Sequence, residues 1–344
     1  MTANSHPVGV LLIQLGTPDS PSVKDVRRYL REFLSDPFVM DIPAPARTLL
    51  LNGVILPFRP RKSAEAYEKI WTEDGSPLLL HTEALRVGVQ RRLGDGYRVA
   101  AGMRYGSPSL QSAIEELVAA GCSRVILLPL FPQYAAASTG SALAAARRVI
   151  AGRADIVETA TVEWFYNVPG FVDAVAQSAE AMINEFRPDH VLFSYHGLPE
   201  QQVRKADPSE QWCLRSSGCC DRITDENRSC YRAQSYATTR SLARALGLEE
   251  GRYSTAFQSR LAGQKWIEPY TDHELTALYR RGVRRLAVLT PSFTADCLET
   301  VEEIGIRGRD QWLELGGKDM LVVPCLNADA AWTTTVADIV RAAV

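Results

Sequence analysis

The 344-residue chain contains no long hydrophobic run. A helix that crosses a bilayer needs about 18–20 apolar residues, and the longest candidate, at residues 125–132, is short and interrupted by prolines. The N-terminal stretch MTANSHPVGVLLIQLG lacks the basic start and small-residue cleavage site of a secretory signal, and the Arg-rich pattern of a mitochondrial presequence. We therefore expect a cytoplasmic protein.

The chain also has almost no net charge. Its 38 Lys and Arg residues nearly balance its 40 Asp and Glu residues, which gives a formal net charge of −2. Proteins that bind nucleic acid usually carry a basic excess that pairs with phosphates. The composition therefore gives no reason to expect a nucleic-acid partner.

The common nucleotide and acyl-transfer motifs are missing as well. No G-x-G-x-x-G follows a predicted strand, and neither G-x-x-x-x-G-K-[ST] nor the nucleophile elbow G-x-S-x-G occurs in the chain. The sequence therefore does not support a dehydrogenase or a hydrolase of the common α/β types.

The sequence does contain an alternation of short apolar strands with helical stretches. The strands are predicted at residues 8–15, 98–103, 124–130, 156–160, 190–195, 252–257, 285–290 and 320–323. Helices are predicted near 22–34, 109–120, 138–151, 170–186, 231–246, 272–281, 294–313 and 327–343. Near-continuous apolar strands separated by helices indicate parallel sheets covered on both faces. We predict an α/β fold of two similar doubly wound lobes, each with a parallel four-stranded sheet, with a boundary near residue 160.

The residues just after the strands are the first candidates for a site, because ligands of such sheets bind beyond the carboxyl ends of the strands. His196 follows one strand in SYHGLP, and a neutral imidazole can accept a proton or bind a metal near pH 7. Asp296 and Glu299 follow another strand and share a helix face three residues apart. A carboxylate at a helix start also complements the helix dipole, and for Asp296 this structural alternative is strong.

One segment, Phe33 to Arg61, is apolar, rich in proline and followed by basic residues. Its simplest interpretation is a long irregular connection packed on the core. The alternative is an apolar lip that faces a hydrophobic ligand or a membrane surface. From the sequence pattern alone, the irregular connection is slightly favoured.

Four of the seven cysteines lie within 18 residues, with the spacing C-x5-C-C-x9-C at Cys213, Cys219, Cys220 and Cys230. Four thiolates suit a tetrahedral Zn²⁺ site or an iron–sulfur cluster, and zinc is the more generic interpretation. Incidental cysteines in a surface loop are the structural alternative, and disulfides are disfavoured in a reducing compartment. Cys122, Cys297 and Cys325 are interpreted as ordinary thiols.

Several motifs together resemble the ferrochelatase family. They are QLGTP at the first strand end, FPQYAAASTGS after the third strand, SYHGLP, and PSFTADCLET before a helix, in the right order and spacing. The resemblance runs from about Val8 to the end of the chain. It implies a two-lobed chelatase fold and the insertion of Fe²⁺ into protoporphyrin IX to form haem. It also implies that the final helix returns to the first lobe, which gives lobes of residues 1–160 plus 326–344 and 161–325, with the cysteine-rich segment at 201–232.

The resemblance assigns roles to individual residues. His196 matches the family's site histidine, Glu299 its catalytic carboxylate and Asp296 the neighbouring acidic residue, so the resemblance implies that His196 and Glu299 handle the substrate Fe²⁺. Positions that match the lining of the porphyrin cleft are Leu15, Arg104, Tyr105, Tyr134 and Trp266. Arg104 or Arg59 could pair with a propionate. Cys297 departs from the family pattern, because many members have His at that position.

The resemblance also bears on the open alternatives. It favours a [2Fe–2S] cluster on Cys213, Cys219, Cys220 and Cys230, because a bacterial subgroup holds such a cluster with cysteines inside the chain at this region. It favours the lip for residues 33–58, with peripheral contact at the inner membrane. The alternative functions are coproporphyrin III ferrochelatase, a cobalt or nickel chelatase, and a non-catalytic tetrapyrrole-binding or iron–sulfur sensor protein.

Overall fold

The computed structural model describes residues 6–260 and 263–344, so the first five residues of the N-terminal stretch examined for targeting signals lie outside the described part. The chain divides into two compact units. The first comprises the chain up to Phe131, Ala136–Trp164 and Asn327–Val344, and the second comprises Pro132–Ala135 and Phe165–Leu326.

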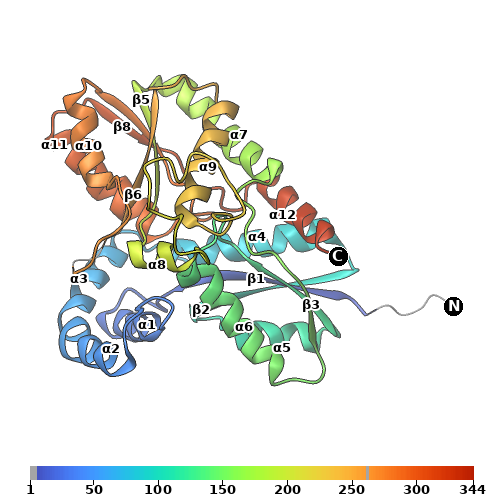
Figure 1. The fold of residues 1–344 in the computed structure, drawn as a ribbon. Helices are drawn as coiled ribbons and strands as arrows, with labels where there is room; N and C mark the ends of the chain where they lie inside the picture. Colours follow the sequence, from blue (N-terminus) through green and yellow to red (C-terminus); the bar gives the residue numbers. More distant parts are fainter. Residues whose placement is uncertain (1–5, 261–262) are drawn as a thin grey trace. The chain divides into compact units, whose positions relative to one another are not determined.

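The first unit contains a parallel sheet with the strand order β2-β1-β3-β4. Its strands are β1 (Val8–Thr17), β2 (Tyr97–Gly106), β3 (Arg124–Pro129) and β4 (Val157–Thr161). Its helices are α1 (Val23–Ser35), α2 (Ala44–Leu50), α3 (Leu56–Glu68), α4 (Pro77–Leu93), α5 (Leu110–Ala119), α6 (Ser141–Ala151) and α12 (Ala330–Ala342), with π-helical turns η1 (Leu51–Ile55) and η2 (Ala136–Gly140). Helices α4 and α12 lie on one side of the sheet, and α5 and α6 on the other (Figure 1).

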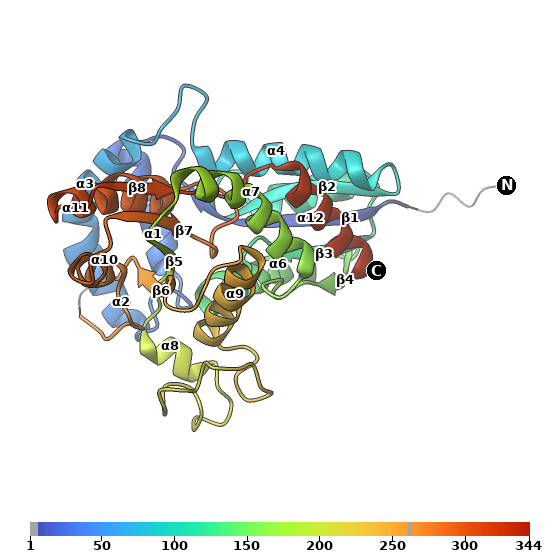
Figure 2. The same ribbon diagram turned by 90° about the horizontal axis from the view of Figure 1, so that it is seen from above.

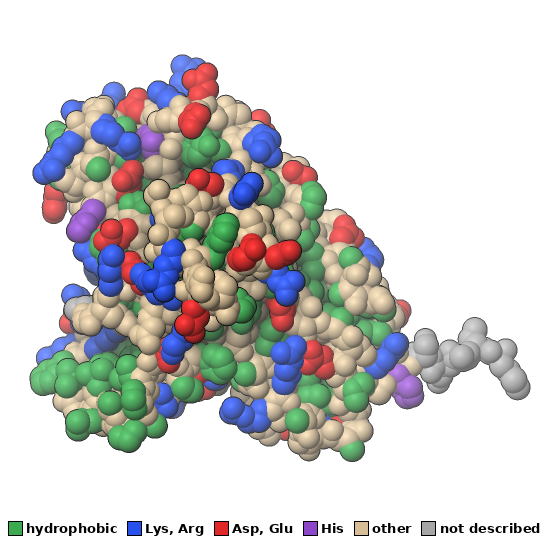
Figure 3. Space-filling view, in the orientation of Figure 1, with side chains coloured by type: hydrophobic (Ala, Val, Ile, Leu, Met, Phe, Trp, Pro, Cys, Tyr) green, Lys and Arg blue, Asp and Glu red, His purple; other side chains and the backbone are tan. Residues whose placement is uncertain are grey.

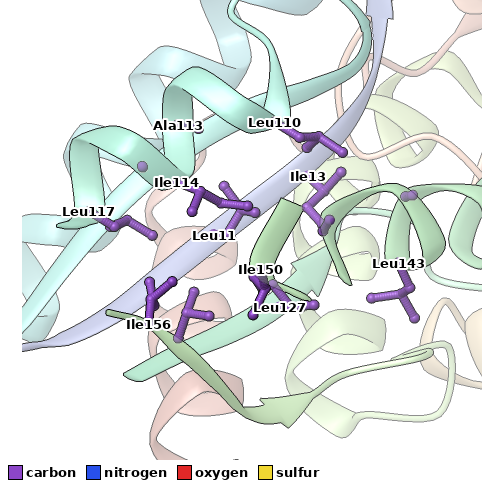
Figure 4. Close-up of a cluster of buried hydrophobic side chains, with 14 of the residues drawn as sticks. Leu11, Ile13, Leu110, Ala113, Ile114, Leu117, Leu127, Leu143, Ile150 and Ile156 are labelled. Atoms are coloured by element: carbon purple, nitrogen blue, oxygen red, sulfur yellow. The ribbon is translucent and has the colours of Figure 1, made fainter. Parts of the chain in front are cut away.

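The core of the first unit follows from the apolar run of β1, whose residues Val10 to Ile13 are fully buried. Alternate residues of that strand, Leu11 and Ile13, point at Ile114 of α5 and Leu143 of α6 in one continuous apolar cluster (Figure 4). Burial on both faces is what makes the strand a continuous hydrophobic run instead of an alternating one. The packed sheet holds the carboxyl ends of β1 and β2 side by side, with Gly16 paired to Tyr105.

The second unit contains a parallel sheet with the strand order β6-β5-β7-β8. Its strands are β5 (His190–His196), β6 (Tyr253–Gln258), β7 (Arg285–Leu289) and β8 (Asp319–Val322). Its helices are α7 (Pro169–Phe186), α8 (Glu200–Lys205), α9 (Tyr231–Ala245), α10 (Thr271–Arg280) and α11 (Arg309–Glu314), with the π-helix η3 (Glu299–Gly308). The prediction of two parallel four-stranded sheets is confirmed.

Two parts of the second unit differ from regular α/β architecture. The helix predicted at 294–313 is a ten-residue π-helix, η3, that continues into the short helix α11. Residues 206–230, which contain all four clustered cysteines, form an irregular loop between α8 and α9 (Figure 2). Long π-helices and long loops are uncommon and often functional.

The interpretation of residues 33–61 as an irregular connection packed on the core is wrong. After α1 ends, residues 44–68 are helical through α2, η1 and α3. The prolines at the starts of α2 and α3 are compatible with helix, because the first turn has no use for their missing N–H groups. Leu49 and Phe58 on these helices are 75% and 76% exposed, so much of the segment's apolar surface faces outward instead of the core.

Helix α4 is a second element that the sequence pattern did not predict. It is buried on two sides, since it packs against β1 and β2 and against α12, where Thr333 fills the space beside Gly88. A helix with two apolar faces gives no clear 3.6-residue alternation of apolar and polar positions.

No helix in the described ranges 6–260 and 263–344 is both long enough and apolar enough to span a bilayer.

Candidate functional site

His196 is the last residue of β5, where parallel strands present their carboxyl ends. Its backbone N–H donates to Ser292 Oγ at 3.0 Å, and its ring lies 6.3 Å from the ring of Phe293. Its Nδ1 lies 2.6 Å from the Gly197 carbonyl oxygen, which can only accept, so Nδ1 carries the hydrogen in this arrangement. In the neutral ring the lone pair is then on Nε2, the nitrogen that can accept a proton or bind a metal ion.

The loop after His196 is held against a short stretch that contains Trp266. Ile267 N–H donates to the Leu198 carbonyl at 2.9 Å, and Glu200 N–H donates to the Lys265 carbonyl at 3.0 Å. Gly197 permits the loop to lie close to β6 and to Trp266, because a Cβ at that position would lie 2.7 Å from the Gln258 carbonyl oxygen and 3.3 Å from Trp266 Cε3. The structure thus brings Trp266, which is almost fully buried, next to the backbone of the histidine loop.

Glu299 is the first residue of η3, and Asp296 lies three residues before it. Asp296 Oδ1 accepts hydrogen bonds from Thr300 Oγ1 at 3.0 Å and from the Cys325 backbone N–H at 3.2 Å, which fixes the entrance of the helix. Burial raises the pKa of the neighbouring Cys297 thiol well above its usual value, and the Glu299 charge adds to the shift. Asp296 therefore has defined structural contacts. The Glu299 residue is half-buried.

Two polar residues at the end of β6 attach η3 to the sheet, of which Gln258 is the last residue of the strand and Ser259 follows it. Gln258 Nε2 donates to the Glu299 carbonyl at 2.9 Å, and Gln258 Oε1 accepts from Ser194 of β5 at 2.7 Å. Ser259 donates to Glu303 through its backbone N–H at 2.9 Å and through its hydroxyl. Since Gln258 also pairs with His196 across the sheet, these contacts link Glu299 and the histidine within one unit.

Gln258, Ser259 and Glu303 are not among the site residues predicted from the sequence. The available signal was the position of Gln258 and Ser259 at the end of a strand, together with a Glu one helical turn beyond Glu299.

In the first unit, Leu15, Arg104 and Tyr105 lie at the carboxyl ends of β1 and β2. Arg104 Nη2 and the Tyr105 hydroxyl both donate to Asp36 Oδ2, the latter at 2.8 Å. Ser141 donates to the same oxygen at 2.5 Å and accepts from Arg104 Nε at 2.7 Å. The Arg104 side chain is 19% exposed and Asp36 only 3%, so the guanidinium reaches the surface from a buried carboxylate.

Asp36 was missed by the sequence reasoning, although it follows α1 directly. Burial alone would raise its pKa, but hydrogen bonds from Ser141, Phe38 N–H and Tyr105, together with the Arg104 charge, outweigh burial and lower the pKa. The carboxylate therefore remains ionised beside Arg104.

Tyr134 belongs to the short stretch of the second unit at 132–135. Its backbone N–H donates to Gln234 Oε1 at 2.6 Å, and Gln133 Nε2 donates to Thr238 Oγ1 at 3.0 Å. Both acceptors are on α9, the helix that begins directly after Cys230. Helix α9 thus positions the Tyr134 backbone.

The four clustered cysteines are all 2–4% exposed, which is unusual for a polar loop. Cys219 Sγ lies 3.6 Å from Cys220 Sγ, and the Cys230 side chain interacts with those of Cys213 and Cys220. These contacts join the thiols in a row. No three His, Cys, Asp or Glu side chains in the described ranges are grouped as a single metal ion would need.

Asp207 orders the start of this loop. Its carboxylate is 2% exposed and accepts hydrogen bonds from Ser209, from Trp212 N–H at 2.7 Å and from Cys213 N–H at 2.9 Å. In the middle of the loop, Arg232 Nη1 donates to Cys220 Sγ at 3.2 Å, and Arg240 Nη1 donates to the Cys220 carbonyl at 3.2 Å. Protein contacts therefore fix the start and the middle of the loop.

A contiguous apolar surface covers helices α2 and α3 of the first unit (Figure 3). Its exposed large side chains are Phe38, Ile42, Leu49, Leu50, Val54 and Phe58. Basic residues Arg59, Arg61 and Lys62 follow directly and are exposed. An apolar patch with a basic border is typical of a surface that contacts a membrane or a hydrophobic ligand.

Comparisons with known proteins agree with one another. The family model described as Ferrochelatase matches residues 7–344. Three similar curated proteins are each called ferrochelatase. The one from Coxiella burnetii (strain CbuG_Q212) is 47% identical over 338 residues, covering 98% of this chain and 94% of that protein. The proteins from Azotobacter vinelandii (strain DJ / ATCC BAA-1303) and Legionella pneumophila (strain Lens) are each 45% identical over 333 residues, covering 96% and 97% of this chain and 98% of each relative.

Among solved structures, the sirohydrochlorin chelatase SirB from Bacillus subtilis subspecies spizizenii in complex with cobalt has a similar fold. The TM-score is 0.54 at 9% identity, with 97% of this chain and 94% of that chain covered. At this identity the likeness concerns the fold alone. The full-length family match and the close relatives show that the chain belongs to the ferrochelatase family.

Proposed function

We propose that this chain is a metal chelatase that inserts ferrous iron into protoporphyrin IX to form protohaem, the terminal step of haem synthesis. The observation that carries the proposal is the full-length family match, with relatives called ferrochelatase at 45–47% identity. The site geometry supports it, because the second unit places an imidazole with an available Nε2 at a strand end and links it through Gln258 to Glu299.

The reaction removes two pyrrole protons from the porphyrin and lets four ring nitrogens bind the metal ion. In one assignment, His196 Nε2 accepts the pyrrole protons while Glu299 and Asp296 move iron or protons. In the other, His196 binds the incoming Fe²⁺ and a carboxylate takes the protons. Both assignments use the Nε2 lone pair of the neutral ring, and the Nδ1 contact with the Gly197 carbonyl selects the tautomer that leaves this lone pair on Nε2. A cleft that bends the porphyrin exposes the nitrogen lone pairs to the metal ion.

The residues proposed to contact the porphyrin are Leu15, Arg104, Tyr105, Tyr134 and Trp266. Trp266 packs beside the histidine loop and is 6% exposed. Arg104 uses Nε and Nη2 for Ser141 and Asp36, and we propose that its remaining donors pair with a porphyrin propionate.

The test is an anaerobic insertion assay that follows the porphyrin spectrum with Fe²⁺ and either protoporphyrin IX or coproporphyrin III. We expect turnover with protoporphyrin IX and slower turnover with coproporphyrin III, whose four propionates need more basic partners. Preference for coproporphyrin III would reassign the substrate. Porphyrin binding without turnover of either compound by the intact protein would instead indicate a tetrapyrrole carrier.

We further propose that Cys213, Cys219, Cys220 and Cys230 hold a [2Fe–2S] cluster. The donor set fits, because four buried thiols adjoin one another and Cys220 Sγ receives a hydrogen bond from Arg232. The 3.6 Å between Cys219 Sγ and Cys220 Sγ is close to the ~3.8 Å expected for two thiolates on one tetrahedral metal with bonds of about 2.3 Å. When bound, the cluster would supply a structural link and a redox-sensitive centre, since chelation itself needs no electron transfer.

Metal analysis tests the cluster proposal directly. Protein purified without oxygen should be brown, with two irons and two acid-labile sulfides per chain, and Cys→Ser variants at the four positions should lose the colour. A colourless protein that contains zinc would contradict the proposal.

We also propose that residues 33–58 are a lip that contacts the membrane surface, which would make the protein peripheral at the inner membrane. The support is the exposed apolar surface on α2 and α3 and the basic residues that follow it. Basic side chains next to an apolar patch favour anionic lipid headgroups.

A further inference from the structure

Arg232 lies at the point where the cysteine loop meets the stretch that contains Trp266. It is the second residue of α9 and is half-buried. Its Nη1 donates to Cys220 Sγ at 3.2 Å, while its Nε and Nη2 donate to the Glu268 carbonyl at 3.4 Å and 3.2 Å. The guanidinium carbon lies 4.8 Å from the centre of the Tyr236 ring, which limits its movement. The Arg232 guanidinium therefore joins the cysteine loop at Cys220 to the stretch at Glu268.

The residues just before Glu268 lead to the histidine loop. Trp266 and Ile267 precede Glu268 and are almost fully buried, and they pair with Leu198 and Pro199. That pairing begins two residues after His196. The Phe257 N–H also donates to the Pro269 carbonyl at 2.8 Å, so the segment is attached to β6 on its other side. A displacement of the Glu268 carbonyl would change the position of Trp266 and of the loop that follows His196.

We propose that Arg232 is a positioning residue that couples the state of Cys220 to the Trp266 stretch and thereby to the histidine loop. This inference rests on the proposed role of the four cysteines as cluster ligands. With the sulfur negatively charged in a cluster, the Arg232 donor is held by a charge-assisted hydrogen bond. When the cluster is lost and the sulfur becomes a neutral thiol or an oxidised product, that hydrogen bond weakens and the guanidinium no longer fixes the Glu268 carbonyl. The cluster then acts as a brace for the active-site loop.

Arg240 provides a matched control. It is also an arginine of α9 and also contacts Cys220, but through the backbone carbonyl. A variant at Arg240 should therefore disturb the cysteine loop without releasing the Trp266 stretch.

Amide hydrogen exchange of the full-length protein tests the coupling. The informative amides are those of Ile267 and Glu200, which hold the Trp266 stretch to the histidine loop. In Arg232→Gln both should exchange about tenfold faster or more, since the variant loses a hydrogen bond to a charged group. Arg240→Gln should leave them as in the wild type. Amides of β5, such as Phe193, serve as the internal reference, because their unchanged protection shows that the unit remains folded.

Removal of the cluster provides a second test. In the wild type it should raise the exchange rates of the Ile267 and Glu200 amides. In Arg232→Gln it should change these rates little, because the coupling is already broken. In the loaded protein Arg232→Gln should also lower the reduction potential of the cluster, since a positive donor to a cluster sulfur has been removed. Arg232→Lys keeps the charge and should fall between the wild type and Arg232→Gln.

The proposal is overturned if Ile267 exchanges equally in the wild type and in Arg232→Gln, or if Arg240→Gln releases it to the same extent. A purified protein without iron or sulfide would contradict the cluster proposal instead. In that case faster exchange of Ile267 in Arg232→Gln than in the wild type would show that Arg232 fixes the Trp266 stretch through the Glu268 carbonyl without any cluster.

Discussion

Asp36 is a buried carboxylate that holds the side chains of two residues at the end of β2. It accepts hydrogen bonds from Arg104, Tyr105 and Ser141, residues that are 68, 69 and 105 positions away in the sequence. No local pattern reveals such a residue, because its partners come together only when β2 and α6 pack beside the end of α1. The position of His196 at the end of a strand could be predicted, because the apolar run before it and its place in the sequence are local features.

Asp36→Asn tests this arrangement. The variant removes the charge that holds Arg104, and we expect a loss of about 2–3 kcal/mol in the free energy of unfolding, as for other hydrogen bonds to charged groups. The KM for porphyrin should rise as well, because Arg104 is no longer held in place. Urea unfolding and steady-state kinetics measure the two effects. Asp19→Asn is the control, since Asp19 pairs with Arg28 on the exposed surface and should change neither quantity.

The acid stability of the protein should depend on the same carboxylate. The pKa of Asp36 is lowered in the folded protein, so its contribution is fully present above the unfolded value of about 3.9 and is lost as the pH falls through the lower folded value. Asp36→Asn should therefore flatten the acid limb of the stability–pH curve. A variant curve parallel to that of the wild type below about pH 4 would show that Asp36 titrates normally.

Helices α2 and α3 show how an element can be misjudged from composition. Five prolines, at positions 37, 43, 45, 57 and 60, led to the prediction of an irregular connection, although α2 and α3 each tolerate a proline in the first turn. The strands were easier to predict, since burial on both faces gives β1, β3 and β5 continuous apolar runs. The π-helical form of η3 was not predictable, because no sequence pattern separates a π-helix from an α-helix.

The exposed apolar side chains of these helices should control binding to membranes. The double variant Leu49→Glu/Phe58→Glu should bind vesicles of phosphatidylethanolamine and phosphatidylglycerol at least about tenfold more weakly in a flotation assay. The reason is that burying either apolar side chain is worth about 1.5–3 kcal/mol. Leu313→Glu, at an exposed apolar position on α11, is the control and should bind as the wild type does. Equal flotation of all three proteins would contradict the lip proposal, and vesicles without the anionic lipid test the role of the basic residues.

The first unit is completed by residues from the opposite end of the chain. Helix α12 packs on α4, with Trp332, Val336 and Val340 fully buried. The pattern of strands and helices predicted α12 itself, but only the family resemblance implied that it returns to the first lobe. The reason is that a helical pattern shows which face is apolar and does not show which element covers it.

Trp332→Ala tests the contribution of α12 to the first unit. Truncation of a fully buried tryptophan usually costs about 3–5 kcal/mol, so the unfolding midpoint of the first unit should fall markedly in urea. Leu313→Ala, which truncates an exposed side chain of the second unit, is the matched control and should have little effect. Equal midpoints for the two variants would show that the unit is stable without this packing.

The central claim of the account is that His196 performs the chemistry of iron insertion. Its most direct test is the initial rate of anaerobic Fe²⁺ insertion into protoporphyrin IX by His196→Ala, compared with the wild type and with His273→Ala, which truncates an exposed histidine of the same unit. We expect His196→Ala to lose at least about 10²–10⁴-fold in rate, the range for a proton-transfer group, while it keeps its circular dichroism spectrum and still binds porphyrin. His273→Ala should turn over normally. A near-normal rate for His196→Ala would contradict the account.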